Sequence, residues 1–124
     1  MRFYKCEHCG NLVAMIQDSG VNPVCCGEAM HEYKANTLDA SLEKHVPAIK
    51  IDGKKVRISV GNEPHPMLEE HHIMWVALES AKGIALKYLH PKEKPEVSFT
   101  VSEDDVPLVA YELCNIHGLW KKNS

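Results

Sequence analysis

Four of the five cysteines lie close together near the N-terminus, and this cluster constrains the fold more than any other feature. They occur in Cys6-Glu7-His8-Cys9-Gly10 and in Cys25-Cys26-Gly27. A Cys-x-x-Cys-Gly segment is typical of a metal-binding turn, because glycine lets the backbone bend so that amide groups face the sulfurs. Four thiolates suit zinc or a single iron in a tetrahedral site. Because adjacent residues cannot easily present both sulfurs at ideal angles, we expect Cys25 and Cys26 to distort that tetrahedron.

The cysteine positions predict two units. Residues 1–36 contain the four clustered cysteines and form a piece too short to bury an adequate core, so this unit needs a metal or a similar staple. Residues 37–124 contain the fifth cysteine, Cys114, and are numerous enough for a small independent domain.

The second unit has the pattern of a β domain. Val56, Ile58 and Val60 alternate with polar residues, as in a half-buried strand, and Asp52-Gly53 predicts a hairpin between this strand and the apolar residues before it. Short strands separated by turn residues favour a mainly β fold with an immunoglobulin-like antiparallel sandwich. Helix is expected for no more than a turn or two, within residues 38–44. Further strands are predicted at residues 73–79, 84–89, 97–101 and 109–113.

Composition excludes several classes of protein. The net charge of −3, from 14 basic and 17 acidic residues, argues against a general nucleic-acid binder. No apolar run approaches the roughly 18 residues of a membrane span, and the N-terminus lacks the apolar core of a secretory signal. We therefore expect a cytoplasmic protein whose thiols stay reduced. Five cysteines cannot all pair within one chain, so these and the eight histidines favour metal binding over disulfides.

A second candidate metal set combines the remaining cysteine with histidines. Cys114-Asn115-Ile116-His117 follows a predicted strand, and prolines lie near His45 and on both sides of His65. His71 precedes the next predicted strand. Nearby prolines restrict the backbone and so help to preorganise ligands. One cysteine and four histidines would surround a metal as a square pyramid, leaving the open position that is typical of a catalytic site.

Other interpretations of these residues stay open on spacing alone. Any single histidine is more often a solvated loop residue, and His8, His31, His72 and His90 are expected to lie outside both sets. A blue-copper site would need a methionine soon after His117, which is absent, and fewer histidines. A redox dithiol at Cys6 and Cys9 is disfavoured, because the βαβ pattern typical of such dithiols does not surround them. A non-catalytic electron carrier and a zinc-stapled interaction module are the remaining alternatives.

The motifs resemble those of a known family. The four-cysteine pattern is similar to the desulforedoxin-type iron domain. Three further segments resemble the superoxide reductase site: Glu43-Lys44-His45-Val46-Pro47, Pro64-His65-Pro66-Met67 and Cys114-Asn115-x-His117-Gly118. Together, and in this order over nearly the whole chain, they resemble desulfoferrodoxins, the two-iron superoxide reductases.

The resemblance implies two iron ions per chain and an enzyme that reduces superoxide to hydrogen peroxide without releasing oxygen. It assigns one iron to Cys6, Cys9, Cys25 and Cys26. It assigns the other to equatorial His45, His65, His71 and His117, with Cys114 axial. It further implies a homodimer and an external electron donor such as rubredoxin.

Two neighbours of His45 are candidate catalytic residues. The charge of Lys44 would attract the anionic substrate. The carboxylate of Glu43 would fill the open iron position after oxidation and ease the release of peroxide.

Overall fold

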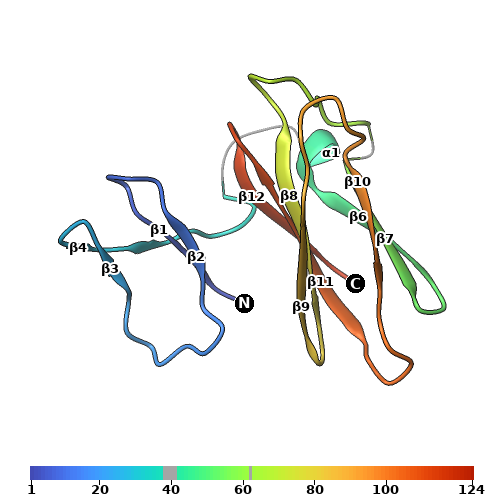
Figure 1. The fold of residues 1–124 in the computed structure, drawn as a ribbon, viewed down its shortest axis with the longest axis horizontal. Helices are drawn as coiled ribbons and strands as arrows, with labels where there is room; N and C mark the ends of the chain where they lie inside the picture. The colour runs from blue at the N-terminus through green and yellow to red at the C-terminus, as the bar shows by residue number, and fades with distance from the viewer. Residues whose placement is uncertain (38–41, 62) are drawn as a thin grey trace. The chain divides into compact units, whose positions relative to one another are not determined.

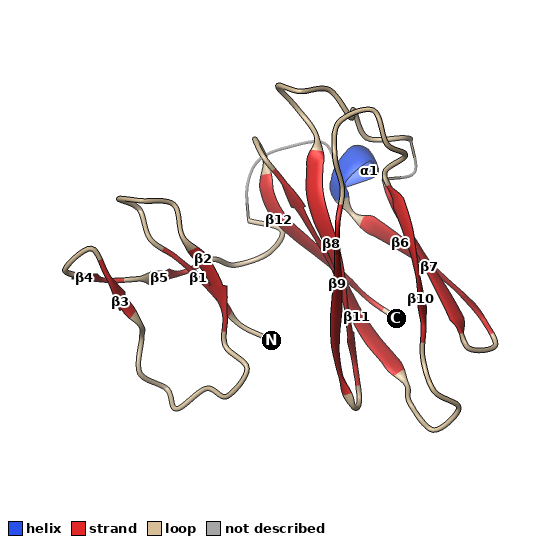
Figure 2. Ribbon diagram, viewed as in Figure 1, coloured by secondary structure: helices blue, strands red, loops and turns tan. Residues whose placement is uncertain are grey.

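The computed structural model describes residues 1–37, 42–61 and 63–124, without the side chains of Leu42 and Glu43. The chain divides into two compact units, Met1–Lys34 and Ala35–Ser124. Strands dominate both units (Figure 2), so the predicted mainly β class is confirmed. Within the described residues, no helical segment has the length and hydropathy needed to span a bilayer.

The first unit is built from very short strands. β1 pairs antiparallel with β2 on one side and with β5 on the other, and β3 and β4 form a separate hairpin. Its hydrophobic cluster is small, with Tyr4, Cys6 and Met30 buried. Such a core is too small to stabilise a fold by itself. The strands are β1 (Phe3–Lys5), β2 (Leu12–Ala14), β3 (Val24–Cys25), β4 (Glu28–Ala29) and β5 (His31–Glu32).

The second unit is an antiparallel sandwich with strand orders β10-β7-β6 and β12-β11-β8-β9 (Figure 1). This division into three and four strands is that of an immunoglobulin constant-type sandwich. The predicted hairpin around Asp52-Gly53 joins β6 to β7. The strands are β6 (Pro47–Asp52), β7 (Lys55–Val60), β8 (Ile73–Ser80), β9 (Gly83–Tyr88), β10 (Glu96–Thr100), β11 (Pro107–Cys114) and β12 (Gly118–Asn123).

The core of this unit lies between the two sheets. Val56, Ile58 and Val60, the alternating residues of the sequence pattern, are almost completely buried on β7. They pack against apolar residues of β8, β10 and β11, including Val76 and Phe99. The alternation thus identifies the inner face of the sheet, because successive side chains of a strand point to opposite faces.

The structure contains one strand that the sequence did not predict, and its short helix agrees with the expected turn or two. β12 was not predicted, although it pairs with β11 along its whole length. The only helix in the described residues is the short α1 (Leu42–His45), and residues 38–41 of the predicted helical turn lie outside the described residues. α1, the loop before β8 and the β11–β12 turn lie at one end of the sandwich (Figure 1).

Candidate metal centres

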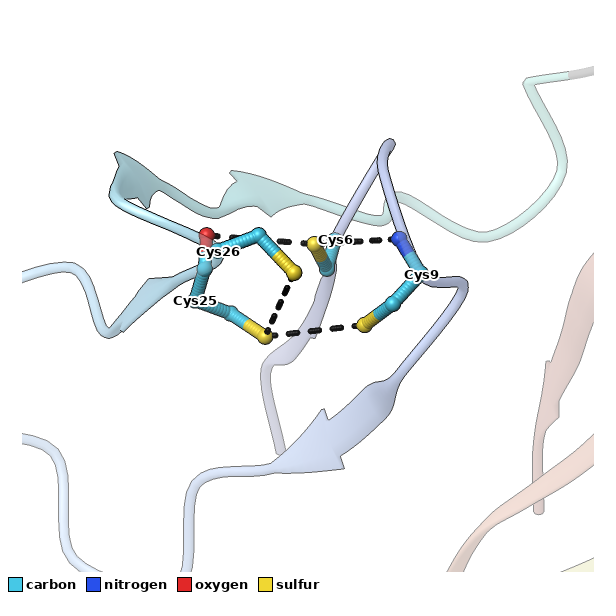
Figure 3. Close-up of side chains that lie close together, drawn as sticks. All are labelled: Cys6, Cys9, Cys25 and Cys26. Atoms are coloured by element: carbon cyan, nitrogen blue, oxygen red, sulfur yellow. Dashed lines mark hydrogen bonds between the residues drawn. The ribbon is translucent and has the colours of Figure 1, made fainter.

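The four N-terminal cysteines converge on one point (Figure 3). All four sulfurs lie within 4.8 Å of one another, with Cys9 and Cys25 sulfurs 3.6 Å apart and Cys25 and Cys26 sulfurs 3.9 Å apart. Four sulfurs about 2.3 Å from a tetrahedral ion would lie ~3.8 Å apart. The spacing therefore fits one zinc or iron ion.

Backbone geometry explains how two adjacent cysteines share one site. Cys25 ends β3, and continued strand geometry would send the Cys26 side chain to the opposite face. Cys26 instead has a φ of 53°, in the left-handed region, and Gly27 follows with a φ of 74°. This backbone turn brings both sulfurs to the same side. A left-handed conformation costs a non-glycine residue roughly 1–2 kcal/mol, which metal binding would offset.

The four thiols differ in how readily they lose a proton. The backbone N–H of Cys9 donates to the Cys6 sulfur and lowers the pKa of Cys6 to about 6. The neighbouring thiols Cys9, Cys6 and Cys25 raise the pKa of Cys26 to about 12. A first thiolate thus forms easily at Cys6, whereas hydrogen bonds to the neighbouring sulfurs hold the proton on Cys26. A bound cation compensates the negative charge and allows four thiolates together.

The second set gathers residues from three separate segments of the chain. His45 ends α1, His65 and His71 lie in the loop between β7 and β8, and Cys114 ends β11, with His117 in the turn that follows. Donor atoms of His45, His65, His71 and Cys114 lie within 4.8 Å of one another. His117 joins them, with its Nδ1 3.0 Å from His45 Nε2 and 3.9 Å from Cys114 Sγ.

The four histidine rings form a square. Neighbouring ring centroids are 4.7 Å apart for His45–His65, His65–His71 and His45–His117, and 5.1 Å apart for His71–His117. These neighbours lie at 77–90° to each other, while His45 and His71 face across the diagonal at 6.4 Å and 28°. Such a square of imidazoles is suited to four equatorial ligands, with the sulfur as a fifth donor.

The ring nitrogens of this set lie close to one another, and one of them lacks a protein partner among the described residues. His65 donates from Nδ1 to the Pro66 carbonyl at 2.7 Å, so the lone pair of its Nε2 faces His45 Nε2 at 3.2 Å. His71 Nε2 is buried, and no described protein group bonds to it. Burial lowers the pKa of His65 to about 4, so its imidazole stays neutral. Converging neutral imidazoles are a good fit for a transition-metal ion.

Trp120 supports two of the histidines, a role that the sequence pattern did not show. Its fully buried indole stacks on His45 with ring centroids 5.0 Å apart, and its Nε1 donates to the His117 carbonyl at 3.0 Å. The sequence offered one indication of this role, which is that Trp120 lies two residues after Gly118. Because side chains alternate along β12, Trp120 lies on the same face of the strand as Gly118.

The other predicted residues are distributed as follows. Lys44 is exposed, and its charge adds to burial in lowering the pKa of His71. The side chain of Glu43 lies outside the described residues. His8, His31, His72 and His90 belong to neither metal cluster found among the described residues.

Comparison with known proteins connects both units to one family. The model of the desulfoferrodoxin N-terminal domain matches residues 1–32, and the desulfoferrodoxin model matches residues 37–123. A desulfoferrodoxin from Nitratidesulfovibrio vulgaris is 44% identical over 119 residues, covering 95% of this chain and 92% of that one. A desulfoferrodoxin homolog from Archaeoglobus fulgidus is 42% identical, covering 98% and 95%.

A solved structure extends the similarity to three dimensions. The crystal structure of the superoxide reductase from Treponema pallidum covers 98% of both chains with a TM-score of 0.82 and 38% identity. Both units therefore match the same family by three comparisons: the family models, the relatives of nearly equal length and this solved structure. The chain belongs to the desulfoferrodoxin family.

Proposed function

We propose that this chain is an iron-dependent superoxide reductase whose active site is the histidine–cysteine set of the second unit. The observation that carries the proposal is the square of four imidazoles with the Cys114 sulfur as fifth donor. Five donors leave a six-coordinate ion one position for substrate. The similarity to the Treponema pallidum superoxide reductase supports the same conclusion.

The proposed reaction is superoxide + one electron + two protons → hydrogen peroxide. Ferrous iron bound by His45, His65, His71, His117 and Cys114 would supply the electron, and an external donor would restore it. The protein would thereby remove superoxide without evolving oxygen.

Cys114 is placed to act as an electron-donating thiolate. Burial raises the pKa of its thiol, while the backbone N–H groups of His117 and Ile116 oppose that shift. The His117 N–H lies 3.4 Å from the sulfur. Such hydrogen bonds stabilise the anionic form and limit how much charge the sulfur gives to a bound metal.

Lys44 is proposed to attract superoxide to a protein with a net charge of −3. It follows Glu43 at the end of α1, is exposed, and contributes to lowering the pKa of His71, so its charge acts close to the site. A local positive charge raises the association rate of an anion even on an acidic protein. The assignment of Glu43 as the carboxylate that closes the open position after oxidation stays a prediction from sequence.

The remaining assignments are part of the same proposal. Residues 1–36 would form a desulforedoxin-like Fe(Cys)4 domain with iron on Cys6, Cys9, Cys25 and Cys26, and residues 37–124 the catalytic domain. The Fe(Cys)4 centre would relay electrons or stabilise its unit. A rubredoxin-like donor, a homodimer and a cytoplasmic location are carried over from the family resemblance.

The test is direct reaction of the iron-loaded, fully reduced protein with a pulse of superoxide. We expect one hydrogen peroxide for each superoxide consumed, with oxidation of one iron and no oxygen release. Protein loaded with zinc is the control and should not react. Evolution of one oxygen for every two superoxide ions consumed would indicate dismutation. An iron-loaded protein that does not react with superoxide would indicate an electron carrier. Either result would overturn the proposal.

A further inference from the structure

Asn115 joins two ligand-bearing segments by three hydrogen bonds. Its backbone N–H donates to the His72 carbonyl at 3.1 Å, and its Oδ1 accepts from the His72 N–H at 2.9 Å. Its Nδ2 donates to the Glu70 carbonyl at 3.1 Å. The bonds therefore hold the backbone immediately before and after His71 against the turn that carries Cys114 and His117.

His71 depends on its backbone more than His45 and His65 do. The His65 ring is fixed by its bond to Pro66, and the His45 ring is stacked on Trp120. No described protein group hydrogen-bonds to the buried His71 Nε2. The His71 backbone lies in a tight turn, exchanging hydrogen bonds with Leu68 at 2.9 and 3.2 Å. A turn of this kind orients the ring only if the turn itself is anchored.

We propose that Asn115 is the positioning residue that fixes His71 at its corner of the histidine square. The residue does not touch the metal position and acts through the backbone of Glu70 and His72. The two side-chain bonds use both ends of the amide, because the oxygen accepts one bond while the nitrogen donates the other. The inference relies on the metal site of the proposed function and not on its superoxide chemistry.

Asn36 offers a matched control elsewhere in the same unit. Its backbone N–H donates to the Leu119 carbonyl at 2.9 Å, its Oδ1 accepts from the Lys121 N–H at 2.9 Å, and its Nδ2 donates to the Lys121 carbonyl at 3.2 Å. Asn36 is thus an exposed asparagine with the same three kinds of bond, but its partners Leu119 and Lys121 flank Trp120 and not His71. Asn36→Ala should remove the same kind of contact without disturbing His71.

The experiment loads the full-length wild type, Asn115→Ala and Asn36→Ala with Co²⁺ and records paramagnetically shifted proton NMR. Shifted imidazole resonances report on the second site alone, because the first set contains only cysteines. In Asn115→Ala we expect the His71 resonances, identified by their loss in His71→Ala, to move or disappear. Competition with a chelator should show the second Co²⁺ ion held roughly 10–100-fold more weakly. Asn36→Ala should lose about as much thermal stability as Asn115→Ala. It should keep the His71 resonances and the wild-type affinity for the second Co²⁺ ion.

Asn115→Asp separates the two side-chain bonds and provides a variant if Asn115→Ala does not fold. The carboxylate still accepts from the His72 N–H but cannot donate to the Glu70 carbonyl, so an intermediate loss of Co²⁺ affinity is expected. The inference is overturned if both Asn115 variants keep the His71 resonances and affinity of the wild type, or if Asn36→Ala weakens Co²⁺ binding equally. A wild type that binds Co²⁺ through all four histidines but fails to reduce superoxide when loaded with iron would overturn the proposed function alone.

Discussion

The two candidate metal sites differ in what surrounds them. In the first unit Cys9 and Cys26 are exposed, and only a small cluster around Tyr4 lies beneath the site. In the second unit His45, His65 and Cys114 are each at most 2% exposed. Cys114 is itself part of a core that spans both sheets. The comparison indicates that metal stabilises the fold of the first unit, whereas the fold of the second unit preorganises its site.

The largest expected effect is therefore loss of the first unit when its metal is lost. Cys6→Ser removes a buried ligand, and the small cluster cannot replace the free energy of metal binding. Two-dimensional amide NMR should show collapsed signals for residues 1–34 and dispersed signals for residues 35–124. A first unit that stays folded in Cys6→Ser would show that its core suffices without metal.

The second unit should respond instead to damage in its core. Ile58→Ala leaves a cavity at a completely buried position between the sheets and should lower the free energy of unfolding of this unit by about 2–5 kcal/mol. Denaturant titration measures the change. Ile16→Ala, at a side chain that is 91% exposed in the first unit, is the control and should stay within about 0.5 kcal/mol of the wild type. Equal losses of unfolding free energy in Ile58→Ala and Ile16→Ala would contradict the proposed importance of the core of the second unit.

A buried carboxylate near the second site should make the stability of that unit depend on pH. Glu112 is fully buried, and neither carboxylate oxygen has a hydrogen-bond partner among the described residues. Burial raises the pKa of Glu112 well above its ordinary value of 4.5. Folding therefore favours the protonated form, so this group costs stability as the pH rises above 4.5 toward its raised pKa.

Glu112→Gln should remove that cost, because the amide does not titrate. The free energy of unfolding of the variant relative to wild type should rise between pH 4.5 and pH 8, as measured by denaturant titration at each pH. Glu103→Gln changes a carboxylate that is 83% exposed and should keep the wild-type pH profile. Parallel profiles for Glu112→Gln and the wild type would refute this role of the buried acid.

The smallest expected effect concerns access to the second, more enclosed site. Lys44→Ala should slow superoxide capture by about tenfold and weaken its dependence on ionic strength, because the local attraction is lost. Pulse radiolysis at several salt concentrations gives both quantities. Lys50→Ala, an exposed lysine on β6, should leave them unchanged. An unchanged rate in Lys44→Ala would leave this lysine without a role in capture.

Much of the second unit could be predicted because its signals are local. The alternation around Ile58 and the turn at Asp52-Gly53 specify a strand and a hairpin within a few residues. β12 was missed because Leu119 and Trp120 are both buried, so burial does not alternate at its start. The strands of the first unit are two or three residues long, which is too short for any periodicity to appear.

The supporting contacts of the sites were beyond prediction because they join distant residues. The metal-ligating residue types and their spacing are visible in the sequence, and the structure brings all nine proposed ligands into two clusters. The position of Trp120 after Gly118 indicates only which face of β12 it lies on, and nothing local indicates that it stacks on His45 or that Asn115 holds the backbone around His71. Nor does the sequence reveal the left-handed backbone of Cys26, which lets Cys25 and Cys26 face the same point.

The distribution of ligands along the chain has a consequence for biosynthesis. The first set is complete at Cys26, so a ribosome need expose only the first unit before a metal can bind there. The second set begins at His45 but requires Cys114 and His117 on the β11–β12 hairpin. N-terminal units emerge and fold first during synthesis. The two metals would therefore enter at different stages, the catalytic one only after the sandwich has closed.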